Sequence, residues 1–151
     1  GSLNSRGWNE INLAGPPILF ALVMGLLLSR QLNLLGLGDE LSVGLGNSLF
    51  RSRCLIGASA TLLAASSVSV GGLIGFVGLI VPHAVRFLFG TDYRIVLPFS
   101  ALLGAFTLSA ADLISRSGSI EVPVGIITSL IGAPIFIFLL YRRQKSLTNM
   151  R

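Results

Sequence analysis

Five apolar runs follow one another along the chain, and charged residues, glycines and short polar stretches separate them. A helix needs roughly 20 mostly apolar residues to cross a bilayer core about 30 Å thick. The pattern therefore predicts five transmembrane helices, over Leu13–Leu28, Cys54–Val70, Leu73–Phe89, Ile95–Ile114 and Val122–Tyr141. The expected fold class is an all-α integral membrane protein.

The second and third runs are separated only by Gly71 and Gly72. Together they are too long for a single span, so the chain must break between them. Glycine tolerates backbone conformations that are closed to other residues, and Gly75 follows close behind the pair. We therefore expect a helical hairpin that turns at Gly71, Gly72 and Gly75.

The stretch Gln31–Phe50 is too polar and glycine-rich to cross a bilayer and too apolar for a solvated loop. Its leucines predict a first short helix before Gly38, and Asp39 is expected to cap a second one that Gly46 ends. Exposed leucines on such a pair indicate a docking surface for a protein partner. An amphipathic pair resting on the lipid interface explains the same pattern, and the sequence leaves both open.

The basic residues fall almost entirely on one side of the predicted membrane. With alternating spans, one side holds Arg30, Arg51, Arg53, Arg86, Arg94, Arg142, Arg143, Lys145 and Arg151, and the other holds Arg6 and Arg116. Cytoplasmic flanks are enriched in Lys and Arg, so we expect the N-terminus outside and the C-terminus in the cytoplasm. The first twelve residues do not read as a signal peptide, and an odd number of spans starting outside suggests the C-terminal part of a longer chain.

Composition narrows the function classes. Of 151 residues, 52% are hydrophobic and only 11% are charged, against about 25% charged in ordinary soluble domains. The net charge of +5 is scattered between apolar runs rather than gathered on one solvated face, which disfavours nucleic-acid binding. The single cysteine, Cys54, excludes a disulfide within this sequence. Together with the single histidine, His83, it supplies too few ligands for most metal sites. The phosphate-binding pattern GxxxxGK[ST] is absent from the sequence, so we expect no ATP hydrolysis and no cofactor on this chain.

The third run carries small residues and a proline. Gly72, Gly75 and Gly78 recur every three residues, which predicts one stripe for close helix packing. Pro82 is expected to bend the helix or free a carbonyl. His83 and Arg86 are three residues apart and share a face at the cytoplasmic boundary, where a structural role is preferred over a proton relay or metal site.

Two further features lie in the last two runs. Asp112 and Arg116 have the spacing of an ion pair on one helix, near the outer membrane surface. Pro123 is expected in the first turn of the last helix, where a missing N–H costs nothing. Gly132 and Pro134 predict a kink or break in the middle of that helix.

Two long blocks of the sequence resemble one known family. GFVGLIVPHAVRFLFGTDYRIVLPFSALLGAFTLSAADLISR, followed by VPVGIITSLIGAPIFIFLL, is similar to the FecCD permeases, the membrane subunits of importers for iron-siderophores, haem and vitamin B12. The upstream LNLLGLGDELSVGLG also resembles the cytoplasmic segment of that family. Such permeases have ten helices, so the resemblance implies that this chain corresponds to helices six to ten.

The resemblance also implies roles for individual residues. By this resemblance the stretch Gln31–Phe50, which we call the coupling segment from here on, would seat in a separate ATPase subunit. The residues implied are Leu37, Gly38, Asp39, Glu40, Leu45 and Gly46, although Ser42 and Val43 stand where the family usually has a small residue. Arg116 would meet an acidic residue of a substrate-binding protein. A structural role is implied for Gly75, Gly78, Pro82, His83, Arg86, Asp112, Pro123, Gly132 and Pro134.

The function expected from this resemblance is a permease subunit of an ATP-driven importer, with iron(III)-siderophore as the favoured substrate, in the inner membrane of a bacterium. Its partners would be the ATPase, which carries ATP and Mg, the binding protein, a second permease copy or paralogue, and helices one to five. An ATP-independent secondary transporter or channel is the alternative, supported by the broken helices but not by any cluster of intramembrane carboxylates. A third reading is an assembly fragment that transports nothing by itself.

Overall fold

The computed structural model describes residues 7–117 and 123–148, with side chains for these residues except 135 and 138–148. The described residues form helices and no strand. In chain order the helices are α1 (Trp8–Leu27), α2 (Ser29–Gly36), α3 (Asp39–Gly44), α4 (Leu49–Gly71), α5 (Val77–Phe89), α6 (Tyr93–Arg116) and α7 (Val124–Thr148).

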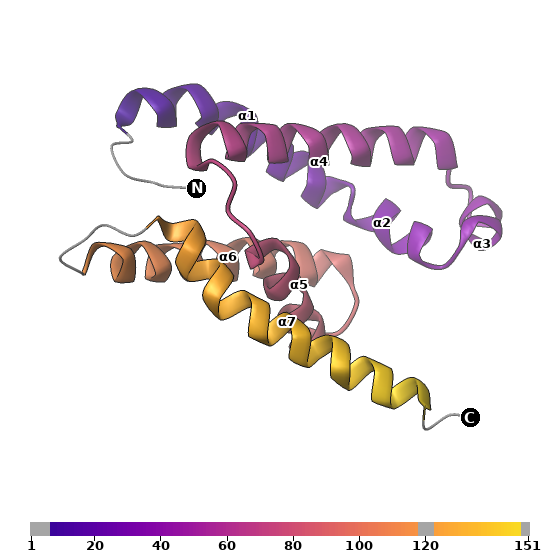
Figure 1. The fold of residues 1–151 in the computed structure, drawn as a ribbon. Coiled ribbons are helices and arrows are strands. Elements are labelled where there is room, and N and C mark those ends of the chain that lie inside the picture. Colours follow the sequence, from indigo (N-terminus) through magenta and orange to yellow (C-terminus); the bar gives the residue numbers. More distant parts are fainter. Residues whose placement is uncertain (1–6, 118–122, 149–151) are drawn as a thin grey trace.

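The helices are arranged in two layers (Figure 1). In one layer α1 packs along α4, and in the other α6 packs against α5 and α7. The short helix α2 joins the layers because it contacts α6 as well as α1 and α4. The turns that carry α2, α3 and the start of α6 lie at one end of the molecule, and the start of α1 and the end of α6 lie at the other (Figure 1).

Three of the five expected spans are long apolar helices in the structure. α1, α4 and α6 are long and apolar enough to cross a membrane, and at about 1.5 Å per residue they measure roughly 30–36 Å. Large apolar side chains such as Leu13, Leu102 and Phe106 are exposed along them. A soluble protein would bury such side chains, so these surfaces suit lipid or further transmembrane helices.

The third expected span differs from the prediction. α5 has only 13 residues because Leu73–Phe76 are not helical, although they are apolar. Gly72 and Gly75 precede the helix, so the predicted glycine stripe with Gly78 is wrong. The predicted break after Gly71 is confirmed, but the helical hairpin is not formed, since α4 packs on α1 and α5 on α6 and α7. The segment 72–76 instead carries the chain from one layer to the other.

The close approach between helices lies elsewhere, at Gly132 of α7. A Cβ atom at this position would lie 2.4 Å from Cβ of Phe76 and 2.8 Å from its Cγ. Phe76 itself has a φ of +66°, a left-handed conformation that costs an L-residue about 1–2 kcal/mol. Its ring packs edge-on against Phe136, with centroids 6.3 Å apart. The missing side chain at Gly132 therefore leaves room for Phe76, the residue directly before α5.

The last helix begins at Val124, two residues after the predicted start at Val122. Pro123 directly precedes α7, and its carbonyl accepts a hydrogen bond from the backbone N–H of Ile126 at 2.9 Å. α7 continues through Gly132 and Pro134, so the predicted break is not present there. The basic residues at positions 142, 143 and 145 lie outside the described side chains.

Candidate functional site

The coupling segment forms the two short helices that its sequence predicts, α2 and α3. Leu37, Leu41 and Leu45 are exposed over more than half of their surface, at 56%, 62% and 60%. Gly46 ends α3 with a φ of +79°, and the backbone N–H groups of Gly46 and Asn47 donate to the carbonyls of Val43 and Ser42. This is the paired bonding of a Schellman cap, which requires a left-handed residue and therefore favours glycine.

Asp39 does not cap α3 as expected, because Gly38 occupies the capping position with a φ of +99°. Asp39 is the first residue of the helix, and its carboxylate accepts two hydrogen bonds from Nη2 of Arg53, at 2.7 and 2.9 Å. Both side chains are more than half exposed, so the ion pair contributes at most about 1 kcal/mol. Its effect is to orient the start of α3 against the first turns of α4.

A buried set of amide and hydroxyl groups fastens the end of α3 to α4. Asn47 Nδ2 donates to Oγ of Ser42 at 2.8 Å, and Oγ of Ser52 donates to Oδ1 of Asn47 at 2.6 Å. Ser42 is fully buried and Ser52 is 5% exposed. Of the two residues that stand where the family usually has a small residue, Ser42 is thus buried and hydrogen-bonded, whereas Val43 is 54% exposed.

A second polar contact joins α2 to the turn between α5 and α6. Asn33 Nδ2 donates to Oδ1 of Asp92 at 2.7 Å, and the backbone N–H of Tyr93 donates to Oδ1 of Asn33 at 2.9 Å. Asp92 caps α6 by accepting the backbone N–H of Arg94 at 2.9 Å. That bond first, and the amide of Asn33 second, hold the pKa of Asp92 below its usual value. We call Asn33, Asp92 and Tyr93 the Asn33 clamp.

The end of α5 lies beside this clamp. The guanidinium of Arg86 lies over the ring of Tyr93, 5.5 Å from its centroid, and reaches the phenol oxygen at 3.5 Å. His83, one turn earlier on α5, is exposed. The described residues contain no group of three His, Cys, Asp or Glu side chains that could hold a metal ion. An open hollow of about 620 Å³ borders the clamp, lined by Asn33, Leu34, Gly36, Leu37, Arg86, Thr91, Asp92 and Tyr93.

The opposite end of α6 carries the predicted ion pair. Nε of Arg116 donates to Oδ2 of Asp112 at 2.8 Å, one helical turn away. About half of the Arg116 side chain remains exposed at 52%. The guanidinium has donors beyond the one used here, so it can still meet an acidic partner.

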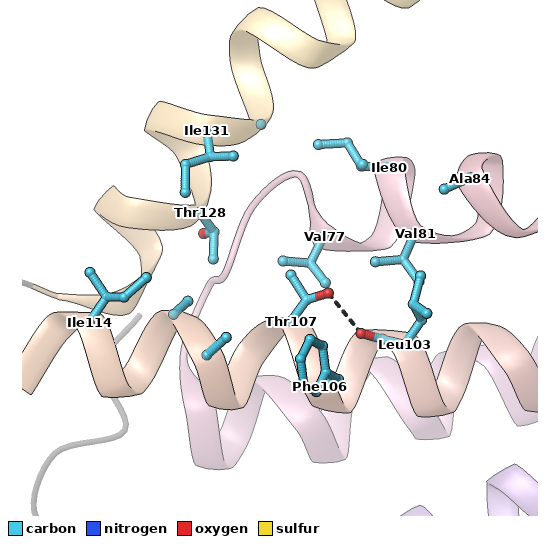
Figure 2. Close-up of a pocket in the computed structure, with 13 residues that line it drawn as sticks. Val77, Ile80, Val81, Ala84, Leu103, Phe106, Thr107, Ile114, Thr128 and Ile131 are labelled. Carbon is cyan, nitrogen blue, oxygen red and sulfur yellow. Dashed lines mark hydrogen bonds between the residues drawn. The ribbon is translucent and has the colours of Figure 1, made fainter.

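An apolar groove of about 300 Å³ lies between α5, α6 and α7 in the second layer (Figure 2). Its two hydroxyl groups bond within their own helices, Thr107 to the carbonyl of Leu103 at 2.7 Å and Thr128 to that of Gly125 at 3.2 Å. Val77, Val81 and Phe106 lie around Thr107. The lining of the groove therefore suits an apolar group better than a polar ligand.

Comparison with known proteins assigns this arrangement of helices. Residues 1–142 match the FecCD transport family. The chain belongs to the FecCD family. A solved structure of a metal-chelate type ABC transporter in an inward-facing conformation superposes with a TM-score of 0.88 at 36% identity, covering 94% of this chain and 46% of that one. The chain therefore belongs to a family of multi-pass membrane proteins.

Curated relatives of this FecCD chain include permeases for different cargoes. YvrB, an uncharacterised ABC transporter permease of Bacillus subtilis, is 44% identical over 96% of this chain and 42% of its own length. The cobalamin import permease BtuC of Halobacterium salinarum is 44% identical over 95% of this chain and 39% of its own. The hemin transport permease HmuU of Yersinia pestis is 41% identical over 96% and 44%. The FecCD chain thus spans less than half the length of these relatives.

Sequence reasoning did not find Asn33, Asn47 or Phe76. The two asparagines carried a weak signal, since each is a polar residue inside or beside an apolar helix and needs a partner when packed. Phe76 carried none, because nothing in the sequence marks an aromatic residue for a left-handed conformation.

Proposed function

We propose that this FecCD chain is part of the permease subunit of an ATP-driven importer, and that α2 and α3 seat on a separate ATPase subunit. The observation that carries the proposal is the pair itself. Three leucines are more than half exposed at one end of the molecule, on helices held by the Asp39–Arg53 ion pair and the Asn47 bonds. An exposed apolar patch on a firmly held scaffold is typical of a protein-binding surface.

The two ends of the molecule take different partners in this proposal. The coupling segment and the basic residues Arg30, Arg51, Arg53, Arg86 and Arg94 face the cytoplasm, as the positive-inside rule requires. The exposed guanidinium of Arg116 faces outward and meets an acidic residue of a substrate-binding protein. ATP and Mg bind the ATPase alone, so this chain performs no catalysis and carries no cofactor.

The proposed transport pathway requires transmembrane helices beyond those of this chain. The relatives are more than twice as long as the chain, so we propose that five further helices and a second permease subunit complete the pathway. Iron(III)-siderophore is the proposed cargo, with the related cargoes haem and cobalamin as the alternatives to be compared. The apolar surfaces of α1, α4 and α6 would then face lipid or these added helices.

The ATPase contact is tested by reversing charge at the start of α3. The double variant Asp39→Lys with Glu40→Lys, made in the full-length permease, should lose the ATPase during co-purification. This variant also breaks the ion pair, so Arg53→Ala serves as the matched control because it breaks the pair and keeps both carboxylates. Undiminished ATPase recovery with the double variant, or equal loss with Arg53→Ala, would refute docking through this face.

The binding-protein contact is tested at the other end. Arg116→Glu should weaken the affinity for the loaded binding protein at least tenfold while the permease still inserts and still retains its ATPase. Asp112→Asn is the control, since it removes the internal ion pair without reversing the charge of Arg116. Unchanged affinity in Arg116→Glu would remove this role.

A further inference from the structure

Both polar atoms of the Asn33 side chain, Nδ2 and Oδ1, form hydrogen bonds with residues that lie about 60 positions later in the chain. Its Nδ2 faces the carboxylate of Asp92 at 2.7 Å, and its Oδ1 faces the backbone N–H of Tyr93 at 2.9 Å. A carboxylate only accepts and a backbone N–H only donates, so this orientation of the amide is the one that satisfies both neighbours. The contact is therefore specific for an asparagine-like group.

The clamp also completes the first turn of α6. The first N–H groups of a helix have no partner within the helix. Asn33 takes that of Tyr93, and Asp92 takes that of Arg94 at 2.9 Å through the same oxygen that accepts from Asn33. One of the two capping groups of α6 therefore comes from α2. A displacement of α2 must either carry the start of α6 with it or break the cap.

The clamp lies at one end of α6, and Arg116 lies at the other. α6 runs without interruption for 24 residues, about 36 Å, from the clamp to Arg116. α2 packs on α6 in addition to the clamp, and Leu37, at the exposed face proposed for the ATPase, comes one turn after Asn33. The helix is thus held at its proposed cytoplasmic end by the segment on which the ATPase is proposed to seat.

We propose that Asn33 is a positioning residue, which transmits movement of the coupling segment to α6 through Asp92 and Tyr93. The inference rests on the proposed function and adds the route by which the two ends communicate. Movement of α2 shifts α6 along or about its axis and so changes the presentation of Arg116, and binding at Arg116 acts back on α2 by the same route. Reciprocity of this kind is required of any coupling between two binding sites.

The test swaps the two side chains of the clamp, which keeps one carboxylate and one amide and keeps the hydrogen bond between positions 33 and 92. Asn33→Asp alone places two carboxylates within 2.7 Å and removes the donor. In the double variant, Asn33→Asp with Asp92→Asn, the new aspartate accepts from Tyr93 N–H and from the amide nitrogen of the new asparagine. The bond from Arg94 N–H is lost in this variant, because in the wild type it goes to the same Asp92 oxygen that faces position 33. Thr91→Ala is the matched control, because Thr91 is exposed in the same turn and takes no part in these bonds.

Each variant is reconstituted as the full-length permease with its ATPase and binding protein, and ATPase activity is measured with and without the loaded binding protein. Asn33→Asp should lower the stimulation ratio, per assembled complex, by at least about fivefold. The double variant should restore at least half of the ratio, and Thr91→Ala should keep it.

Three results would overturn the inference: a normal ratio in Asn33→Asp, no recovery in the double variant, or a matching loss in Thr91→Ala. A wild-type permease that assembles no ATPase, or shows no stimulation at all, would instead contradict the proposed function. The two failures are therefore distinguishable in one set of measurements.

Discussion

Gly132 of α7 is the position where the packing of the second layer leaves least room. In Gly132→Ala the added carbon would lie 2.4 Å from Cβ of Phe76, 2.8 Å from its Cγ and 3.1 Å from Cδ1 of Ile80. Carbon atoms in contact normally stay about 3.5–4.0 Å apart, so α7 must move by about 1 Å or Phe76 must leave its place. We expect Gly132→Ala to destabilise the packing of α7 on α5.

The loss of stability in Gly132→Ala can be estimated from the contacts of the added Cβ atom. The clashing Cβ is attached directly to the backbone and cannot rotate away, so the strain is that of an overpacked core, about 1–3 kcal/mol. At about 2–4 °C per kcal/mol for a chain of this size, the thermal unfolding midpoint should fall by several degrees. The measurement is thermal unfolding of the permease in detergent, followed by size-exclusion chromatography after heating.

Two further variants make the reasoning refutable. Gly78→Ala is the control, since a Cβ there meets nothing within 4 Å among the described residues. Phe76→Gly removes both clashing atoms and relieves the left-handed strain, at the cost of the ring contact with Phe136. Adding Phe76→Gly to Gly132→Ala should therefore recover most of the lost stability. If Gly132→Ala is as stable as Gly78→Ala, or if the double variant is worse than Gly132→Ala, the close approach does not limit the packing.

Further predictions concern the polar contacts of the coupling segment. Asn47→Ala removes both hydrogen bonds to buried Ser42 and Ser52 and should cost about 1–3 kcal/mol in thermal unfolding, with a smaller loss in Asn47→Asp, which still accepts from Ser52. Arg53→Ala breaks an exposed ion pair and should cost at most about 1 kcal/mol in the same assay. The pKa of Asp92 is lowered in the folded protein, so its contribution is present above the pKa of the unfolded chain and is lost as pH falls through the folded value. The difference in unfolding midpoint between the wild type and Asp92→Asn should accordingly be full at pH 7 and shrink as the pH falls through the lowered pKa of Asp92, and a difference that grows on acidification would contradict the assigned bonds.

Local patterns predicted those parts of the fold whose cause is local. The long apolar runs of α1, α4 and α6 indicated helices because any membrane span must satisfy its backbone bonds internally. Gly46 predicted the end of α3, and the spacing of Asp112 and Arg116 predicted their ion pair, since both depend on residues within one or two turns.

The remaining features depend on residues that are distant in sequence. Leu73–Phe76 are apolar and read as helix, but Phe76 is held out of the helical conformation against Gly132, which comes 56 positions later. Asp39 was expected to cap α3, yet Arg53 of α4 takes its carboxylate. The Asn33 clamp joins residues about 60 positions apart, and the local sequence around Asn33 or around Asp92 does not predict that the two side chains meet.

The central claim is that this FecCD chain works in an importer driven by ATP. The most direct measurement is uptake into proteoliposomes that hold the full-length permease and its ATPase, with the loaded binding protein outside, compared for ferric siderophore, haem and cobalamin. The account predicts uptake that requires both the binding protein and ATP hydrolysis, and that stops when the ATPase carries a substitution abolishing hydrolysis. Uptake that continues with the inactive ATPase would contradict the claim and identify a secondary transporter or channel instead.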